Sequence, residues 1–279
     1  TFAPNVQWVG GKTITVNINS GATDTSGNAV VNPSIHSFTT AFSRYAFAVH
    51  PGNIHVISQY TIDGQNGKLR HNGYVQTGSE PVHLAVDPSN RFVFSANNNS
   101  HNISVFALNQ QTGRLELSSV TPTGNYPQWV AVHPNGKFLY SVSFGTNRLY
   151  IFSIDQVTGA LTQTTSQIVA ADLRSVTLDR TGRFAYIVES STNTIRRYSV
   201  DAVSGNLTFQ SSVAAGTTPY EFRLHPNGNF AYTVNENSND IWVYAVNPQT
   251  GILTLTATTP VFGARSITID TTGRFAYVP

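Results

Sequence analysis

The side chains that could do chemistry in this chain are its histidines, carboxylates and arginines, because the sequence contains no cysteine. A thiolate nucleophile, a thiolate metal site and a disulfide are therefore excluded. The sequence also lacks the Gly-x-Ser-x-Gly elbow, the phosphate-binding loop, the dinucleotide fingerprint and the His-Glu-x-x-His motif. Four histidines show no metal-ligand spacing: His36, His55, His71 and His101. We expect neither a metal nor a cofactor.

Two further histidines belong to a repeated turn rather than to a catalytic set. His133 and His225 each begin the sequence His-Pro-Asn-Gly, at 133–136 and 225–228. Pro, Asn and Gly are turn-forming residues. The repetition therefore predicts a structural role for both histidines.

Composition narrows the class of protein. Hydrophobic residues make up 40% of the chain, enough for a core, whereas charged residues make up 11% and the net charge is +2. No run of Lys and Arg occurs, which argues against nucleic acid as a partner. No apolar run long enough to span a membrane occurs either. The low charge and the abundance of Asn, Thr and Ser favour an extracellular or cell-surface bacterial protein. The chain lacks methionine, so we interpret it as a mature or fragmentary piece of something longer.

A repeat of about 46 residues organises most of the sequence. Its clearest mark is a short aromatic strand of the type Arg-Phe-Ala-Tyr. Copies occur at 44–47, 91–94, 137–140, 183–186, 229–232 and 274–277.

Each repeat predicts four strands. The aromatic strand is followed by a polar turn, an alternating strand such as Ile-Trp-Val-Tyr-Ala-Val at 241–246, a Gly hairpin and two more strands. Period-2 alternation and Pro, Gly and Asn punctuation are typical of β-structure. Four strands in this length is the size of one propeller blade. We predict an all-β propeller whose aromatic residues pack between blades.

The number of blades is the next question. Residues 44–279 hold about five repeats. A closed five-bladed ring would leave the last aromatic strand duplicating the first, at 274–277 and 44–47. We therefore expect the chain to stop inside a sixth blade of a larger, seven-bladed ring.

Residues 1–41 do not fit the repeat. They contain an alternating segment at 13–18, a polar turn at 24–28 and Ser-Phe-Thr-Thr at 37–40. This part resembles the C-terminal end of a bacterial surface-layer-type immunoglobulin-like module. We expect two domains: the module fragment at 1–41 and the incomplete propeller at 42–279.

The blades resemble the lactonase-like seven-bladed β-propeller family, whose best-known enzyme branch is 6-phosphogluconolactonase. Four segments carry the resemblance: Glu-Pro-Val-His-Leu-Ala-Val-Asp-Pro at 80–88, Pro-Gln-Trp-Val-Ala-Val-His-Pro-Asn-Gly at 127–136, Val-Asn-Glu-Asn-Ser-Asn-Asp-Ile at 234–241 and Asn-Pro-Gln-Thr-Gly-Ile-Leu at 247–253. It spans nearly all of residues 43–279. The resemblance indicates the fold, but it does not by itself indicate the function, because many surface proteins share such blades.

The resemblance also implies site residues. In this family the innermost strand begins with a pattern close to Pro-Arg-His, whose polar side chains face the central channel. His83 keeps the His, whereas Arg174 and Arg265 keep the Arg, and no blade keeps both. The resemblance also points to Asn235 and Glu236, with Glu189 equivalent to Asn235.

These residue types suit lactone hydrolysis. His83, Glu221 or Glu236 could activate water as a base. Arg174 and Arg265 could stabilise the developing oxyanion or bind an acidic group. The alternative is that these charges form structural ion pairs between blades.

Two functions stay open. The first is a secreted or cell-surface structural or binding platform, which could self-assemble by pairing of unpaired edge strands or bind matrix partners. The alternative is a lactonase-type hydrolase that binds a small lactone or carbohydrate and uses water as the nucleophile. Convergence of His83, Arg174, Glu221 and Arg265 in one site would favour the enzyme.

Overall fold

All regular elements described in the structure are β-strands, as the repeat predicts. The computed structural model describes residues 13–18, 34–39, 44–50, 54–169 and 172–279. Contacts divide the chain into two compact units, one of residues 1–46 and 60–70 and one of residues 47–59 and 71–279. No helix long and apolar enough to cross a membrane occurs in the described residues.

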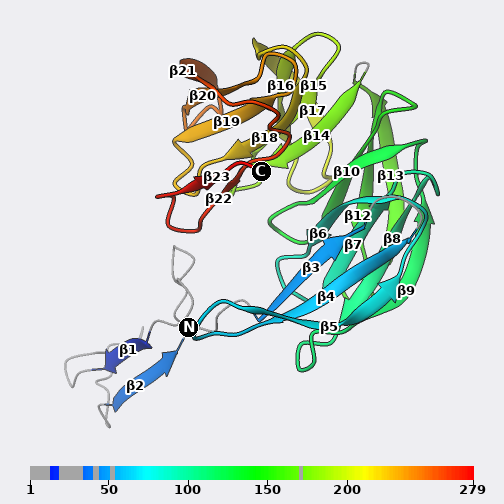
Figure 1. The fold of residues 1–279 in the computed structure, drawn as a ribbon, viewed down its shortest axis with the longest axis vertical. Helices are drawn as coiled ribbons and strands as arrows, with labels where there is room; N and C mark the ends of the chain where they lie inside the picture. The colour runs from blue at the N-terminus through cyan, green and yellow to red at the C-terminus, as the bar shows by residue number, and fades with distance from the viewer. Residues whose placement is uncertain (1–12, 19–33, 40–43, 51–53, 170–171) are drawn as a thin grey trace, which may run out of the picture. The chain divides into compact units, whose positions relative to one another are not determined.

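Four complete sheets follow one another in the larger unit, and each has four antiparallel strands in chain order (Figure 1). They are β6 (Pro81–Val86), β7 (Phe92–Asn97), β8 (Asn102–Leu108) and β9 (Leu115–Pro122); β10 (Pro127–Val132), β11 (Phe138–Ser143), β12 (Arg148–Ile154) and β13 (Leu161–Ile168); β14 (Leu173–Leu178), β15 (Phe184–Glu189), β16 (Thr194–Val200) and β17 (Leu207–Ala214); and β18 (Pro219–Leu224), β19 (Phe230–Asn235), β20 (Asp240–Val246) and β21 (Leu253–Pro260). The predicted four-stranded blade is confirmed.

Two smaller sheets, one before and one after the four complete sheets in the sequence, also follow the repeat. β3 (Tyr45–Val49), β4 (Val56–Ile62) and β5 (Leu69–Gln76) pair in that order, and β22 (Thr268–Ile269) pairs with β23 (Ala276–Tyr277). By their place in the repeat, β22 and β23 are the first two strands of a blade. The blades meet through their first strands, because β6 contacts β10, β10 contacts β14 and β14 contacts β18. These first strands are therefore the innermost ones.

The core lies between blades, as predicted for the aromatic residues. Phe94, Tyr140 and Tyr186 are fully buried at equivalent positions of three blades. The Tyr140 hydroxyl donates to the Gly205 carbonyl (2.8 Å) and the Tyr186 hydroxyl to the Gly251 carbonyl (2.8 Å), each in the following blade. Each apolar cluster accordingly joins residues of two neighbouring sheets. One blade therefore buries its faces only against the next.

The smaller unit includes the first strand pair. β1 (Thr13–Ile18) and β2 (Ser34–Thr39) pair antiparallel, in agreement with the two strands expected there. The polar turn at 24–28 lies outside the described residues, so the immunoglobulin-like module and the boundary at residue 41 stay predictions.

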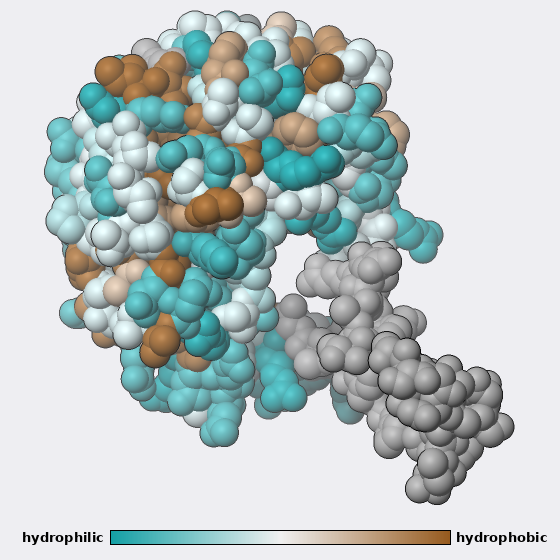
Figure 2. Space-filling view, turned by 180° about the vertical axis from the view of Figure 1, so that it is seen from behind, coloured by the Kyte–Doolittle hydropathy of each residue, from teal (hydrophilic) through white to brown (hydrophobic). Residues whose placement is uncertain are grey.

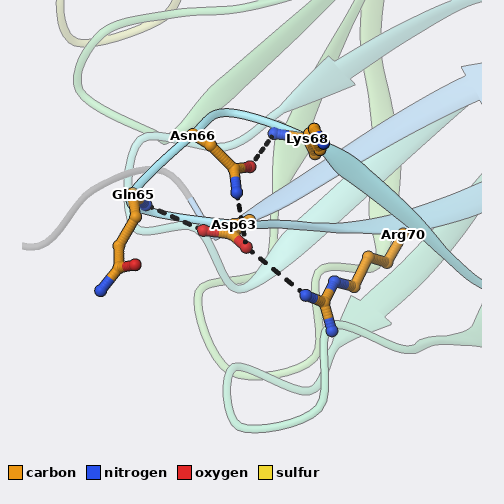
Figure 3. Close-up of polar contacts among 5 residues, drawn as sticks. All are labelled: Asp63, Gln65, Asn66, Lys68 and Arg70. Atoms are coloured by element: carbon orange, nitrogen blue, oxygen red, sulfur yellow. Dashed lines mark hydrogen bonds and ion pairs between the residues drawn. The ribbon is translucent and has the colours of Figure 1, made fainter.

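A tight hairpin between β4 and β5 also belongs to the smaller unit (Figure 3). The Asp63 carboxylate accepts a hydrogen bond from the Gln65 backbone N–H (2.9 Å) and one from the Asn66 side chain (3.2 Å), and it pairs with Arg70 (3.5 Å). These bonds, led by the one from Gln65, hold the pKa of Asp63 below its ordinary value. The group folds a turn and has no catalytic geometry.

Candidate functional site

A β-bulge marks the start of every complete innermost strand. The pairing register shifts between Pro81 and His83, Pro127 and Trp129, Leu173 and Val176, and Pro219 and Glu221. The residue just before each strand has a positive φ although it is not glycine: Glu80 (53°), Tyr126 (55°), Asp172 (54°) and Thr218 (57°). Bulges and positive φ values re-aim side chains and are common at functional sites. Most of the predicted site residues occupy these bulges or the adjoining loops.

Arg174 lies in the bulge of β14 with its guanidinium against two aromatic rings. Its central carbon is 5.1 Å from the centre of the Phe144 ring and 5.6 Å from the centre of the Tyr220 ring. Its Nε is buried and has no hydrogen-bond partner among the described residues. None of the ion pairs among those residues includes Arg174. A cation held in this way can receive an anionic group of a ligand.

His83 stacks on Trp129, with ring centres 3.6 Å apart and an interplanar angle of 22°. Its Nδ1 accepts a hydrogen bond from the Val130 backbone N–H (3.5 Å) in the next blade. Burial, together with the charge of Arg223, lowers the pKa of His83 to about 3. The imidazole is therefore neutral near pH 7 and is a weak base. The geometry favours a structural role for His83 over the predicted catalytic one.

Glu221 occupies the position in β18 that is equivalent to His83, directly after the bulge, and is buried. One carboxylate oxygen, Oε1, pairs with Nε of Arg223, and Oε2 accepts a weak hydrogen bond from the Ile267 backbone N–H (3.4 Å). His83 and Glu221 thus both accept a backbone N–H of the following blade. With both oxygens engaged, Glu221 is poorly placed to take a proton from water.

Glu236 and Arg265, two other predicted site residues, form an ion pair. Arg265 donates to Oε1 of Glu236 through Nε (2.8 Å) and Nη2, so that Oε2 lies outside the pair. The Glu236 side chain is 26% exposed, and its backbone N–H donates to the Thr218 carbonyl (2.9 Å). Of the two predicted carboxylate bases, Glu236 is the one with a partly exposed side chain and with an oxygen, Oε2, that takes no part in its ion pair or in a hydrogen bond to a neighbouring blade.

The end of the second strand carries a further buried polar position. Asn235 there donates to the Asp240 carboxylate (2.9 Å), and the equivalent Glu189 pairs with Arg196 (2.6 Å). Each of these two contacts lies within its own blade, between the second and third strands.

The structure therefore sorts the predicted residues into two groups. Arg174, Glu236 and Arg265 lie where innermost strands start or in the adjoining loops, with side chains that reach solvent or lack a partner. His83 and Glu221 each accept a hydrogen bond from a backbone N–H of the following blade. Arg223 is a residue that the sequence analysis missed. The signal was its place two residues after Glu221, on the same face of the strand.

The comparison with known families agrees with this architecture. A family model described as "Lactonase, 7-bladed beta-propeller" matches residues 17–132, 130–221 and 215–279. The chain belongs to this lactonase family. The sequence-based family resemblance is thereby confirmed, and the first matched segment begins at residue 17.

Solved structures show the same fold. A candidate 6-phosphogluconolactonase from Bacteroides uniformis is 23% identical with a TM-score of 0.75, over 84% of this chain and 73% of that chain. A candidate 6-phosphogluconolactonase from Bacteroides fragilis gives the same identity and TM-score over 84% and 72%. The periplasmic gluconolactonase of Pseudomonas aeruginosa is 18% identical with a TM-score of 0.53, over 83% and 90%. None of the curated proteins matches the chain.

Proposed function

We propose that this lactonase-family propeller hydrolyses a sugar lactone at the end of the molecule where the innermost strands begin. The observation that carries the proposal is Arg174, a cation held on two aromatic rings with a buried Nε that has no partner among the described residues. Arg265, Arg223 and Arg196, by contrast, each have a carboxylate partner. An anionic group would complete the site.

The chemistry assigns one role to each group. A water molecule attacks the lactone carbonyl carbon and gives a proton to Oε2 of Glu236, which acts as the general base. Arg174 stabilises the negative charge on the carbonyl oxygen. The ring C–O bond then breaks, the leaving alkoxide takes the proton back from Glu236, and the product is a hydroxy acid, which ionises to a carboxylate and releases a proton. The carboxylate of that product is also an anion that Arg174 can hold.

The family and the named neighbours support this substrate class. Two of the similar structures are candidate 6-phosphogluconolactonases and a third is a gluconolactonase. The first expectation, a structural or self-assembling platform, has less support. In Figure 2 the apolar side chains on the visible face form separate patches with polar groups between them. Extracellular or cell-surface location stays a proposal.

The test measures lactone hydrolysis above the spontaneous rate by proton release, with glucono-δ-lactone and 6-phosphogluconolactone as substrates. We expect Arg174→Gln to lower kcat/KM by about a hundredfold or more, because a charge-stabilising donor is lost. Arg180→Gln is the matched control, since Arg180 lies beyond the opposite end of β14 and donates to the Pro226 carbonyl. Hydrolysis no faster than the uncatalysed reaction for both substrates would rule out this substrate class. Equal kcat/KM for Arg174→Gln and the wild type would remove Arg174 from the mechanism.

A further inference from the structure

Arg223 connects its own innermost strand, β18, with β10 and, through Trp129, with β6. It extends from β18, pairs through Nε with Glu221 on the same strand, and lies 5.4 Å from the centre of the Trp129 ring on β10. Trp129 in turn stacks on His83 of β6. One guanidinium thus connects blades that are not neighbours, because the β14 blade lies between β10 and β18.

Glu221 is fixed from two sides by this arrangement. Arg223 holds Oε1, and the backbone N–H of Ile267 in the following blade reaches Oε2 (3.4 Å). Glu221 is the residue at which the strand pairing resumes after the bulge that begins at Pro219. The residue inside the bulge is Tyr220, whose ring lies against Arg174. The direction of the Tyr220 side chain therefore depends on how Glu221 is held.

We propose that Arg223 is a positioning residue: by pairing with Glu221 and lying on Trp129, it fixes the bulge that presents Tyr220 and, through it, Arg174. Arg223 itself does not touch the reacting atoms in this scheme. The inference rests on the proposed function only for its effect on turnover, since the positioning of Arg174 is a property of the protein alone.

The shape and charge of Arg223 suit this role. A guanidinium is planar, so it can stack on an indole ring while its edge pairs with a carboxylate. Loss of that charge leaves Glu221 buried without its cationic partner, and a buried unpaired carboxylate forces its surroundings to rearrange. The charge of Arg223 also helps to lower the pKa of His83, which is connected to Arg223 through the ring of Trp129. The titration of His83 is therefore sensitive to the position of Arg223.

The test uses Arg223→Gln and Arg223→Lys in the full chain, with Arg180→Gln as the control. Two readouts need no activity: the NMR signal of the Arg174 Nε–H, whose frequency depends on the Phe144 and Tyr220 rings, and the titration of the His83 ring. In Arg223→Gln we expect the Arg174 signal to move and the pKa of His83 to rise. Arg223→Lys keeps the charge but not the planar guanidinium, so the pKa of His83 should return toward the wild type while the Arg174 signal moves less than in Arg223→Gln. The control should change neither.

The turnover readout separates this inference from the proposed function. If the wild type hydrolyses lactones, Arg223→Gln should raise KM or lower kcat/KM at least about tenfold, because a small displacement of a binding group is enough. If the wild type is inactive but the Arg174 signal moves, the positioning role stands and the lactonase proposal falls. An unmoved Arg174 signal in a folded Arg223→Gln variant overturns the positioning role. Should Arg223→Gln not fold, Arg223→Lys decides: an Arg174 signal identical to that of the wild type would then overturn the role, because lysine lacks the planar group that stacks on Trp129.

Discussion

The neutral state of His83 has a consequence for stability at low pH. Its pKa is about 3 in the folded protein, against an ordinary value of 6.5. Between these values the unfolded chain binds a proton and the folded chain does not, so stability falls as pH drops from about 6.5 toward 3. At 1.36 kcal/mol per unit the loss is at most about 5 kcal/mol.

His83→Gln tests this coupling, because glutamine keeps a side-chain acceptor but does not titrate. We expect the variant to lose less stability than the wild type between pH 6.5 and 4, as measured by urea denaturation at each pH. His71→Gln, which changes an exposed histidine of β5, is the control and should keep the wild-type slope. Identical slopes for His83→Gln and the wild type would mean that His83 is not buried in its neutral form.

The turns that follow the innermost strands begin alternately with aspartate and with histidine in successive blades. Their first residues are Asp87, His133, Asp179, His225 and Asp270. The histidines form contacts between blades: His133 Nε2 donates to the Gly182 carbonyl (2.9 Å) and His225 Nε2 to the Gly273 carbonyl (2.8 Å). In both rings Nδ1 accepts a backbone N–H of its own turn. The structural role predicted for His133 and His225 is thus confirmed, and it extends to the next blade.

Gly182 requires glycine both for its positive φ and for its close contact with His133, and a comparison with Gly228 separates the two effects. Its φ is +72°, and an added Cβ would lie 2.3 Å from Cε1 of His133, whereas Gly228, with a φ of +76°, has nothing within 4 Å of an added Cβ. Gly228→Ala should therefore cost only backbone strain, about 1–2 kcal/mol. Gly182→Ala should cost at least about 1 kcal/mol more because the His133 contact is also lost. Thermal unfolding of both variants measures the two losses of stability. Equal losses would show that the His133 contact with Gly182 does not stabilise the packing between the two blades.

The outermost strand of each complete blade is irregular. Each of β9, β13, β17 and β21 contains a bulge relative to its neighbour, and β9 and β21 end in proline. Bulges and proline hinder the pairing of an edge strand with another chain. These four strands are therefore poorly suited to the strand pairing considered for self-assembly.

At the scale of the whole molecule, the sequence was sufficient to predict the blades. The aromatic strand, the Gly hairpin and the alternating strand recur at a fixed spacing, and each has a local physical cause that tertiary contacts reinforce rather than override. Tyr140 and Tyr186 illustrate this, since the same position packs against the following blade in each case.

The site was less predictable because its contacts join distant parts of the chain. Sequence spacing places His83, Arg174 and Glu221 at related positions, but it does not show that Glu221 is occupied by Arg223 and Ile267. Nor does it show that His83 stacks on Trp129 or that Glu236 takes Arg265 as its partner. Equivalent positions in a repeat share backbone geometry, while the partners of each side chain depend on which residues the neighbouring blades supply.

The assignment of Glu236 as the general base is the central claim, and the turnover number of Glu236→Gln with the best lactone substrate tests it most directly. Glutamine keeps an oxygen for Arg265 but cannot accept the proton, so we expect kcat to fall by about a hundredfold or more. Glu189→Gln, which removes a carboxylate held within one blade, is the matched control. A Glu236→Gln variant that folds and keeps the wild-type kcat would contradict the account.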